Sequence, residues 1–205
     1  MGEVSWKPYV TFADYLEAEQ SSDVKHEWLH GAVYAMPRVT PEHARLSARI
    51  CRLIGNALPA DCEVYASDLM LYAAEVKLST YADGSLVRGP LETIAVKRNG
   101  KLLGEAVINP VVIVEVLSES TERYDREEKF SYYCTLPSLQ ELVLVSQDEV
   151  AVEVFRRPAA GQGRGSSYPF PDPVGGWTRE RAGAGGTVTI HGCPIEVDAV
   201  YGTRA

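Results

Sequence analysis

The hydrophobic positions of this chain follow two periods, one typical of helices and one typical of strands. A long amphipathic helix is predicted after Thr40, with Pro41 in its first turn. Its apolar stripe at helical spacing consists of Leu46, Ile50, Leu53, Ile54, Ala57 and Leu58. A shorter helix is predicted from Thr11 to about Glu19, because a threonine followed three residues later by an acid is typical of a helix N-cap.

Residues Val111 to Leu117 form a short, almost continuous apolar run with one carboxylate, Glu115, in its middle. A run of this length, rich in β-branched residues and followed by polar turn formers, predicts a strand covered on both faces. Burying an unpaired carboxylate there would cost several kcal/mol. Glu115 is therefore expected to pair with a basic group, to bind a cation, or to lie at the open end of its strand.

The segment after this strand, Glu122 to Tyr133, predicts a polar amphipathic helix. Asp125 and Lys129 are four residues apart, which places them on one face of such a helix. A buried acid that leads into a charged helix is the arrangement expected of a functional site.

Further extended segments are predicted from alternating and apolar patterns at 26–36, 62–72, 76–86, 141–145 and 150–155. The last of these alternates, so it is expected to be half exposed near a sheet edge. Asn99 and Gly100 predict a hairpin turn. Helices and strands in this order predict an α/β fold, with a mixed central β-sheet flanked by α-helices.

The length of 205 residues predicts a single domain over residues 1–205. Residues 158–176 are dominated by Gly, Pro and Ser and predict a flexible loop inside this domain, and residues 177–205 predict a small C-terminal β extension. The first twenty residues contain no apolar leader, and no run is long enough to cross a bilayer. These features predict a cytoplasmic protein without a membrane partner.

The chain carries 20 basic and 28 acidic residues, a net charge of −8, which argues against a surface that holds nucleic acid by charge alone. A local basic cleft remains compatible with this total. The four cysteines are scattered, without the spacing of a zinc site or a dense disulfide framework, so reduced thiols are expected.

Asp83, Glu115 and Lys129 are the first candidates for chemistry. Two carboxylates from neighbouring strands cannot both ionise cheaply, and a divalent cation such as Mg²⁺ resolves this by accepting oxygen ligands from each. The cation would activate a water, and an ammonium group beside it would stabilise charge on a phosphate. Spacing alone leaves a structural alternative open, in which Glu115 pairs with Lys129 and Asp83 ends a turn with Gly84.

Other polar residues could support this site. Glu27 is either an extra acid near a metal or a strand residue that is exposed or paired with a core base. His43, at the start of the long helix, could contact phosphate or act as a base, although a lone histidine more often caps or packs. Asp125 is a further candidate, and of Tyr132 and Tyr133 at most one hydroxyl is expected to reach the site.

The stretch from Glu115 to Thr121, followed by Asp125, Lys129 and Tyr132, resembles the signature of the Uma-two family, small bacterial proteins described as putative restriction endonucleases. The resemblance extends over nearly the whole chain, and includes His43 before the long helix and Asp83 after an aromatic residue. It implies the PD-(D/E)xK nuclease-like fold, which is a restriction-endonuclease-like mixed sheet between helices.

The resemblance also implies roles for individual residues. Asp83 matches the acid of the PD element and Glu115 the acid of the ExK element. Leu117 stands where the lysine usually stands, and Lys129 of the following helix is implied to replace it. Glu27 matches an additional acid of the superfamily. Ala82 takes the place of the proline in the PD element.

The sequence therefore predicts a Mg²⁺-dependent (or Mn²⁺-dependent) endonuclease that hydrolyses DNA. A catalytically inactive member that keeps the fold and binds nucleic acid or protein is the alternative, motivated by Ala82 and by the net charge of −8. A homodimer formed through the β extension or through residues 150–155 is a further hypothesis.

Overall fold

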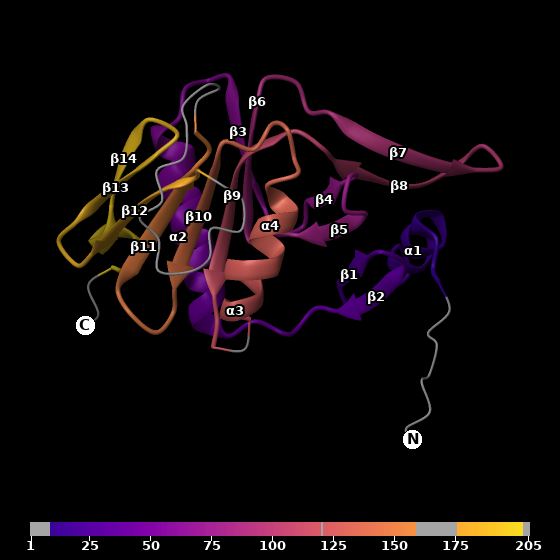
Figure 1. Cartoon of the computed structure of the whole chain (residues 1–205), viewed down its shortest axis with the longest axis horizontal. Helices are drawn as coiled ribbons and strands as arrows, with labels where there is room; N and C mark the ends of the chain where they lie inside the picture. Colours follow the sequence, from indigo (N-terminus) through magenta and orange to yellow (C-terminus); the bar gives the residue numbers. More distant parts are fainter. Residues whose placement is uncertain (1–8, 120, 159–175, 203–205) are drawn as a thin grey trace.

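A computed structural model describes residues 9–119, 121–158 and 176–202 of the chain, and these form two six-stranded β-sheets with a small hairpin and helices around them (Figure 1). The order of strands in the first sheet, here called the central sheet, is β12-β11-β10-β9-β6-β3. The order in the second sheet is β2-β1-β5-β4-β8-β7. The predicted α/β fold with a mixed sheet flanked by helices is confirmed.

The strands of the central sheet are β3 (Cys62–Ala66), β6 (Gly84–Arg88), β9 (Pro110–Leu117), β10 (Glu141–Ser146), β11 (Ala151–Arg156) and β12 (Thr178–Gly183). Those of the second sheet are β1 (His26–Leu29), β2 (Ala32–Ala35), β4 (Met70–Ala73), β5 (Leu78–Tyr81), β7 (Thr93–Arg98) and β8 (Lys101–Val107). The remaining hairpin joins β13 (Thr187–Ile190) to β14 (Cys193–Glu196). The helical elements are α1 (Phe12–Glu19), α2 (Pro41–Ala57), α3 (Glu122–Tyr124), the π-helix η1 (Asp125–Lys129), α4 (Phe130–Tyr133) and α5 (Val197–Tyr201).

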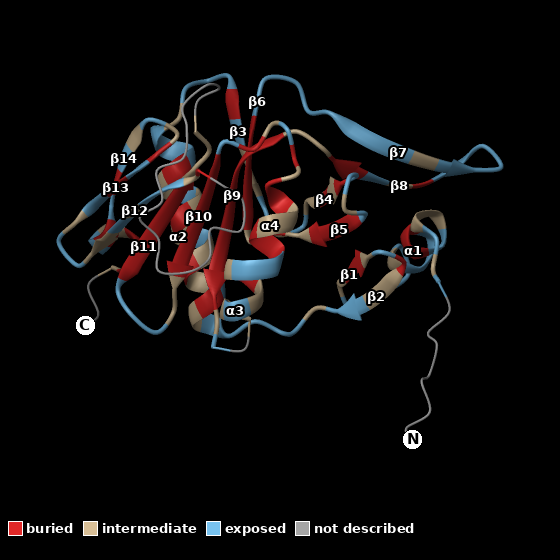
Figure 2. Ribbon diagram, viewed as in Figure 1, coloured by how far each residue is buried: buried red, intermediate tan, exposed pale blue. Residues whose placement is uncertain are grey.

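Strand β9 lies at the centre of the molecule, and all eight of its residues are buried (Figure 2). Alternate side chains point to opposite faces of the sheet. Val112, Val114 and Val116 therefore pack in the core beneath α2, while Ile113 and Leu117 pack beneath the α3-η1-α4 segment. Glu115 shares the second face, so the predicted buried acid is set into the middle of a covered strand.

Helix α2 forms as its sequence predicts. The Thr40 side chain accepts a hydrogen bond from the backbone N–H of His43 at 3.1 Å, and Pro41 occupies the first turn. Leu46 and Ile50 are fully buried against the valines of β9. Burial of each such side chain stabilises the fold by about 1.5–3 kcal/mol, so this contact fixes α2 and its first turn on the central sheet.

The prediction that residues 150–155 form a half-exposed edge strand is wrong. Strand β11 pairs with β10 on one side and with β12 on the other, and its residues Ala151 to Phe155 are buried. The alternating pattern misled because Glu153, the polar residue at its centre, is neutralised inside the fold by arginines of η1 and β12. The strand therefore offers no free edge for the hypothesised dimer.

The segment predicted as one strand at 76–86 is two strands in different sheets. The chain leaves the second sheet at the end of β5, passes through Ala82 and Asp83, and enters the central sheet as β6. Asp83 thus lies at the junction between the sheets. The predicted turn at Asn99 and Gly100 is confirmed, since both have the positive φ, 51° and 80°, of such a hairpin.

The C-terminal part is more varied than the β extension that was predicted. Strand β12 belongs to the central sheet, β13 and β14 form a hairpin, and helix α5, which the sequence reading missed, packs against α2. The predicted loop at 158–176 falls almost wholly on 159–175, outside the described residues. Among the described helices, none combines the length and apolar character needed to cross a bilayer.

Candidate functional site

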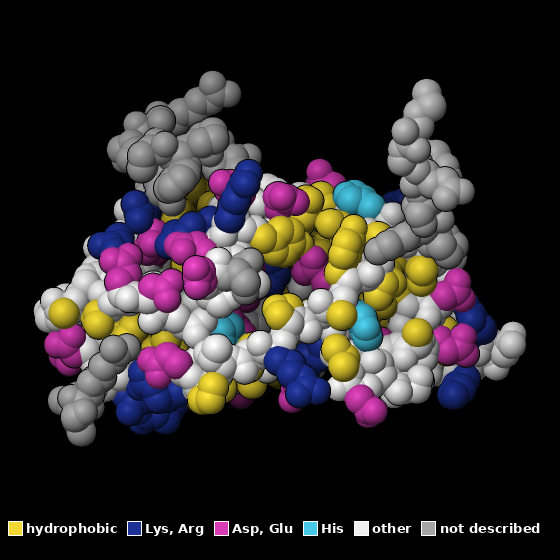
Figure 3. Space-filling model, turned by 90° about the horizontal axis from the view of Figure 1, so that it is seen from below, with side chains coloured by type: hydrophobic (Ala, Val, Ile, Leu, Met, Phe, Trp, Pro, Cys, Tyr) yellow, Lys and Arg dark blue, Asp and Glu magenta, His cyan; other side chains and the backbone are white. Residues whose placement is uncertain are grey.

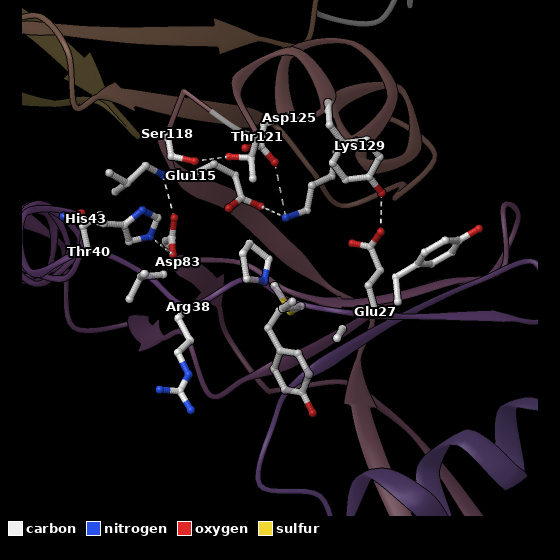
Figure 4. A pocket seen from close by; sticks show the side chains of 18 of the residues that line it. Glu27, Arg38, Thr40, His43, Asp83, Glu115, Ser118, Thr121, Asp125 and Lys129 are labelled. Atoms are coloured by element: carbon white, nitrogen blue, oxygen red, sulfur yellow. Dashed lines mark hydrogen bonds and ion pairs between the residues drawn. The ribbon is translucent and has the colours of Figure 1, made fainter.

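A cavity of about 470 Å³ opens between the central sheet, the α3-η1-α4 segment and the stretch that joins β2 to α2. Figure 3 views the molecule from below and shows this face hollowed near its centre. Acidic side chains from five positions line the cavity, namely Glu27, Asp83, Glu115, Asp125 and Glu128. Two basic side chains, Arg38 and Lys129, also line it. The structure therefore brings the three principal candidates, Asp83, Glu115 and Lys129, into one pocket together with Glu27, His43 and Asp125 (Figure 4).

Glu115 receives two hydrogen-bond donors on one of its oxygens. The Tyr133 hydroxyl donates to Glu115 Oε1 at 2.6 Å, and Lys129 Nζ lies 2.8 Å from the same atom. Burial raises the pKa of the Glu115 carboxyl to about 7; the ammonium of Lys129 acts in the opposite direction, and the carboxylates of Asp83 and Asp125 raise the pKa further. A bound cation would favour the ionised form of this acid.

Asp83 is fixed by two hydrogen bonds to its carboxylate. The backbone N–H of Val116 donates to Oδ2 at 2.7 Å, and His43 Nε2 lies 2.7 Å from Oδ1. Its backbone carbonyl accepts a hydrogen bond from Ser47 of α2 at 3.1 Å. Because Val116 follows Glu115 directly, this arrangement anchors Asp83 beside Glu115 at the junction of the two sheets.

His43 is the third residue of α2 and connects that helix to Asp83. Burial lowers the pKa of His43, but its hydrogen bond to Asp83 and the negative charges of Asp83, Glu115 and Asp125 outweigh burial, so the pKa is raised overall. Gln147 lies on the other side of the ring, with Nε2 3.3 Å from His43 Nδ1. His43 therefore orients Asp83, an acid of the pocket. This is more specific than the capping or packing role that a lone histidine more often has.

Lys129 comes from η1, a π-helix, a type of turn that is frequent at functional sites. Its side chain is buried, and its Nζ lies 3.7 Å from Asp125 Oδ1 as well as beside Glu115. Burial lowers the pKa of Lys129, but the charges of Glu115, Asp125 and Glu27 outweigh it and hold the pKa above its usual value. Lys129 therefore remains a cation inside the pocket. The ion pair of Glu115 with Lys129, which the structural alternative predicted, is present as well.

Glu27 lies on β1 and joins the second sheet to the helical segment. Its Oε1 accepts a hydrogen bond from the Tyr124 hydroxyl, and its Oε2 accepts one from Thr80 at 2.7 Å. The side chain is buried and lines the cavity, so Glu27 is neither an exposed strand residue nor the partner of a core base. Its position agrees with the interpretation as an extra acid of the site.

The tyrosine that contacts Glu115 is Tyr133, whereas Tyr132 does not line the cavity. Asp125, Lys129 and Tyr133 are spaced by four residues, and the wider π turn keeps this spacing on one face of the helix. That repeat was a readable signal in the sequence. The contacts of Tyr124, Thr80 and Gln147 with the site residues join distant parts of the chain and carry no local signal.

The donor chemistry of the pocket suits a hard divalent cation. Asp83 immediately precedes β6 and Glu115 lies in β9, the neighbouring strand of the central sheet, and carboxylate oxygens are the ligands that Mg²⁺ and Mn²⁺ prefer. Each carboxylate oxygen of Asp83 accepts one hydrogen bond and keeps a lone pair for a metal. In the part of the chain that the structure describes, however, no three His, Cys, Asp or Glu side chains are already grouped as a metal cage.

Comparison with known proteins assigns the chain to a family. A sequence profile of the Uma2 family, described as "Putative restriction endonuclease", matches residues 12–179. The chain belongs to the Uma2 family. The resemblance noted in the sequence is thus confirmed.

Two relatives from Synechocystis sp. (strain ATCC 27184 / PCC 6803 / Kazusa) support the assignment. Uncharacterized protein slr1290 is 32% identical over 151 residues, which cover 73% of this Uma2 chain and 75% of the relative. Uncharacterized protein sll1609 is 31% identical over 149 residues, which cover 72% and 81% of the two chains.

The fold is shared with a solved structure. The crystal structure of "a putative nuclease belonging to DUF820" from Anabaena variabilis ATCC 29413 has a TM-score of 0.62 to this Uma2 protein, at 16% sequence identity. The likeness covers 88% of this chain and 91% of the other. At this identity the comparison establishes the fold.

Proposed function

We propose that this Uma2 protein is an endonuclease that hydrolyses phosphodiester bonds of DNA with the help of Mg²⁺ or Mn²⁺. In this proposal Asp83 and Glu115 hold the metal, Lys129 faces the attacked phosphate, and Glu27 assists. The observation that carries it is the convergence of the carboxylate that precedes β6, the carboxylate of the neighbouring strand β9 and one buried lysine on a single pocket. Membership of a family described as "Putative restriction endonuclease" supports the class of reaction.

Hydrolysis adds water to phosphorus and breaks one P–O bond to a sugar oxygen, so the water loses a proton and the departing oxygen gains one. A metal bound by Asp83 and Glu115 would supply positive charge to the phosphate and lower the pKa of a bound water. His43 and the Val116 N–H hold the Asp83 carboxylate in place before substrate arrives. Preorganisation of this kind avoids the cost of ordering the ligand during the reaction.

Lys129 is placed to stabilise negative charge that develops on the phosphate. At the usual lysine position, Leu117 packs in the apolar core beneath α4 and contributes no charge. Lys129 instead approaches Glu115 from η1, with its Nζ 2.8 Å from Glu115 Oε1. Because Lys129 is buried, its fixed ammonium has a larger effect on a nearby charge than it would have in solution.

Glu27 occupies the wall opposite η1 and is held by the hydroxyls of Tyr124 and Thr80. Two fixed donors keep its carboxylate in one orientation. It is therefore suited to accept a hydrogen bond from a water or a metal ligand in the cavity.

Cleavage of supercoiled plasmid DNA in Mg²⁺ or Mn²⁺ tests the proposal. We expect nicked and linear products with the wild-type protein and none above background with Glu115→Gln. The matched control is Glu153→Gln, because Glu153 is also a buried glutamate of the central sheet but lies outside the cavity. Equal cleavage by wild type and Glu115→Gln would refute the assignment.

A catalytically inactive binding module is the second candidate. It is favoured by the existing partners of both acids, since Asp83 is held by His43 and Val116 while Glu115 is paired with Lys129. Calorimetric titration with Mn²⁺ separates the two candidates. Stoichiometric binding that is lost in Asp83→Asn but kept in Asp61→Asn, an exposed aspartate outside the cavity, would support the enzyme. Absence of binding near neutral pH would support the inactive module.

A further inference from the structure

The outer wall of the cavity is the wall segment from Tyr34 to Thr40, which comprises the end of β2 and the loop that leads to α2. Both ends of this wall segment are anchored. Met36 donates its backbone N–H to the Lys25 carbonyl at 2.9 Å, and the Thr40 hydroxyl donates to Gln147 at 2.8 Å. All seven residues line the cavity, so the segment is a built surface of the pocket.

Arg38 is the cation of this wall. Its side chain is exposed, and among the described residues it has no ion pair or hydrogen bond. In Figure 4 it lies across the pocket from the helix that carries Lys129, and its guanidinium points away from Asp83. Lys129, in contrast, is buried and forms ion pairs with Glu115 and Asp125. Arg38 is therefore available at the mouth of the cavity to a second phosphate of the incoming strand, which a guanidinium can bind through two parallel hydrogen bonds.

The same wall carries large hydrophobic side chains that face solvent. Tyr34 is 50% exposed and Val39 is 57% exposed, and both line the cavity with Met36 and Pro37 between them. A duplex bound through its backbone presents phosphates and sugars, and an apolar wall adds little to such contacts. An unpaired nucleotide also presents the face of its base, which stacks on aromatic side chains.

Resting on the proposed function, we propose that the wall segment binds an unpaired nucleotide of a single DNA strand beside the bond to be cut. The base packs on Tyr34 and its apolar neighbours, and Arg38 binds the adjoining phosphate. The wall segment presents an apolar surface next to one cation, Arg38. A nucleotide of a single strand presents a base next to one phosphate, so the two surfaces match. In duplex DNA the bases are stacked inside the helix and reach such a wall only after they are flipped out, which costs free energy.

Fluorescence anisotropy with a labelled single strand of about 12 nucleotides, and with the duplex of the same sequence, tests this inference. Ca²⁺ replaces Mg²⁺, and gel electrophoresis verifies that the DNA stays intact. We expect the wild type to bind the single strand more tightly than the duplex. Tyr34→Ala should weaken single-strand binding by about 10-fold and leave duplex binding unchanged, while Tyr34→Phe should restore it.

Arg38→Ala should weaken both complexes, and on the single strand it should reduce the slope of log K against log salt concentration by about 0.7, the value for one lost phosphate contact. The matched controls are Tyr9→Ala and Arg88→Ala, an exposed tyrosine and an exposed arginine that do not line the cavity. Tighter binding of the duplex, a dissociation constant weaker than about 10⁻⁴ M for the single strand, or normal single-strand binding by either Tyr34→Ala or Arg38→Ala would each overturn the inference.

These outcomes are separable from failure of the proposed function. If the wild type does not cleave DNA but Tyr34 and Arg38 govern single-strand binding, the nuclease proposal fails and the binding wall stands. If the wild type cleaves DNA and both variants bind the single strand normally, the wall is refuted and the nuclease proposal stands.

Discussion

Two buried glutamates of the central sheet, Glu115 and Glu153, lie in one row across its strands. The charged side chains near Glu153 are arginines, whereas those near Glu115 are one lysine and two further acids. Leu144 of β10 is the cross-strand partner of Glu115 on one side and of Glu153 on the other. Both glutamates are almost fully buried, with 5% and 3% exposure. The π-helix η1 supplies a base to each, Lys129 to Glu115 and Arg126 to Glu153.

The surroundings of Glu153 and Glu115 differ in the number of positively charged side chains. Glu153 faces Arg126 at 2.8 Å and Arg179 at 2.6 Å. Burial raises the pKa of Glu153, but these arginines outweigh burial and hold the pKa below its usual value. Among the described residues, Glu115 has one ammonium beside it; burial and the negative charges of Asp83 and Asp125 raise its pKa to about 7.

The contrast between the two glutamates indicates which of them belongs to a functional site. The fold neutralises Glu153 completely, as expected of an acid whose role is structural. At Glu115 it leaves an excess of negative charge beside an open cavity, an arrangement that a divalent cation would relieve. Perturbed carboxylates of this kind gather at functional sites.

The largest expected effect comes from replacing the two cationic side chains of η1, Lys129 and Arg126, one at a time. Lys129→Met should lower the rate of plasmid cleavage by about 10³-fold, because the ammonium proposed to stabilise the phosphate is lost. Arg126→Met should reduce stability and leave the cleavage rate of the folded protein within about twofold, because Arg126 faces the neutralised glutamate. Initial rates measured at a temperature where circular dichroism shows both variants folded check the pair. Similar losses of rate in the two variants would contradict the distinction between the regions.

The pH dependence of stability should have opposite signs at the two glutamates. The folded-state pKa of Glu115 lies above its ordinary value of 4.5, so this residue costs the fold increasingly more as the pH rises from 4.5 to about 7. Glu115→Gln should therefore gain about 3 kcal/mol in free energy of unfolding, relative to wild type, over that interval.

Glu153 should behave in the reverse way. Its folded-state pKa is depressed, so its contribution is complete above pH 4.5 and is lost as the pH falls through the folded pKa. Glu153→Gln should thus be most destabilising near pH 7 and least in acid. Urea unfolding in EDTA, measured from pH 8 to pH 4.5 for Glu115→Gln and from pH 4.5 into the acid range for Glu153→Gln, checks both variants. Stability differences from wild type that change with pH in the same direction for the two variants would contradict the assigned environments.

A third, smaller effect is expected at the junction that positions Asp83. A Cβ added to Gly84 would lie 2.5 Å from Cys51 Sγ, closer than atoms can pack. Gly84→Ala should therefore cost about 2 kcal/mol in free energy of unfolding and lower cleavage through displacement of Asp83. The Cys51→Ala change made in the same molecule removes the obstructing sulfur and should restore most of both losses. If the second change restores neither stability nor cleavage, the glycine at position 84 is not required for close packing of α2 on β6.

The smallest effect is expected at Tyr133. Tyr133→Phe removes the hydroxyl that donates to Glu115 at 2.6 Å and leaves Lys129 in place. The loss should be about 1 kcal/mol in free energy of unfolding and a cleavage rate reduced by about tenfold or less. Tyr132→Phe, at a hydroxyl outside the cavity, is the matched control and should match wild type. A larger loss of rate at Tyr132 than at Tyr133 would show that the contact is misassigned.

Local patterns were sufficient for the parts of the site that lie close together in the sequence. The β-branched run around Glu115 predicts a covered strand, and the spacing of Asp125 and Lys129 predicts one helix face, and both are confirmed. Helix α2 follows from its stripe and its N-cap. In each case the period of the side chains carries the information.

The remaining features depend on contacts between distant segments. The pairing of β11 with β12 turned an apparent edge strand into an interior one, and three arginines distant in sequence from Glu153 surround it. The hydrogen bond of His43 to Asp83 spans 40 residues, and that of Tyr124 to Glu27 spans 97. No propensity or spacing within a short window encodes such pairs, so the residue pattern offered Asp83 and Glu27 only as candidates with structural alternatives, and the family resemblance implied their roles.

A crystal soaked in Mn²⁺ tests the central claim most directly, because anomalous scattering locates that ion. The account predicts one strong anomalous peak in the cavity within about 2.0–2.4 Å of a carboxylate oxygen of Asp83 and of Glu115, and its loss in Asp83→Asn crystals soaked in the same way. Crystals of the control Asp61→Asn should keep the peak. An empty cavity at Mn²⁺ concentrations that saturate any activity, or an ion bound without both carboxylates, would contradict the claim that these two acids share a metal.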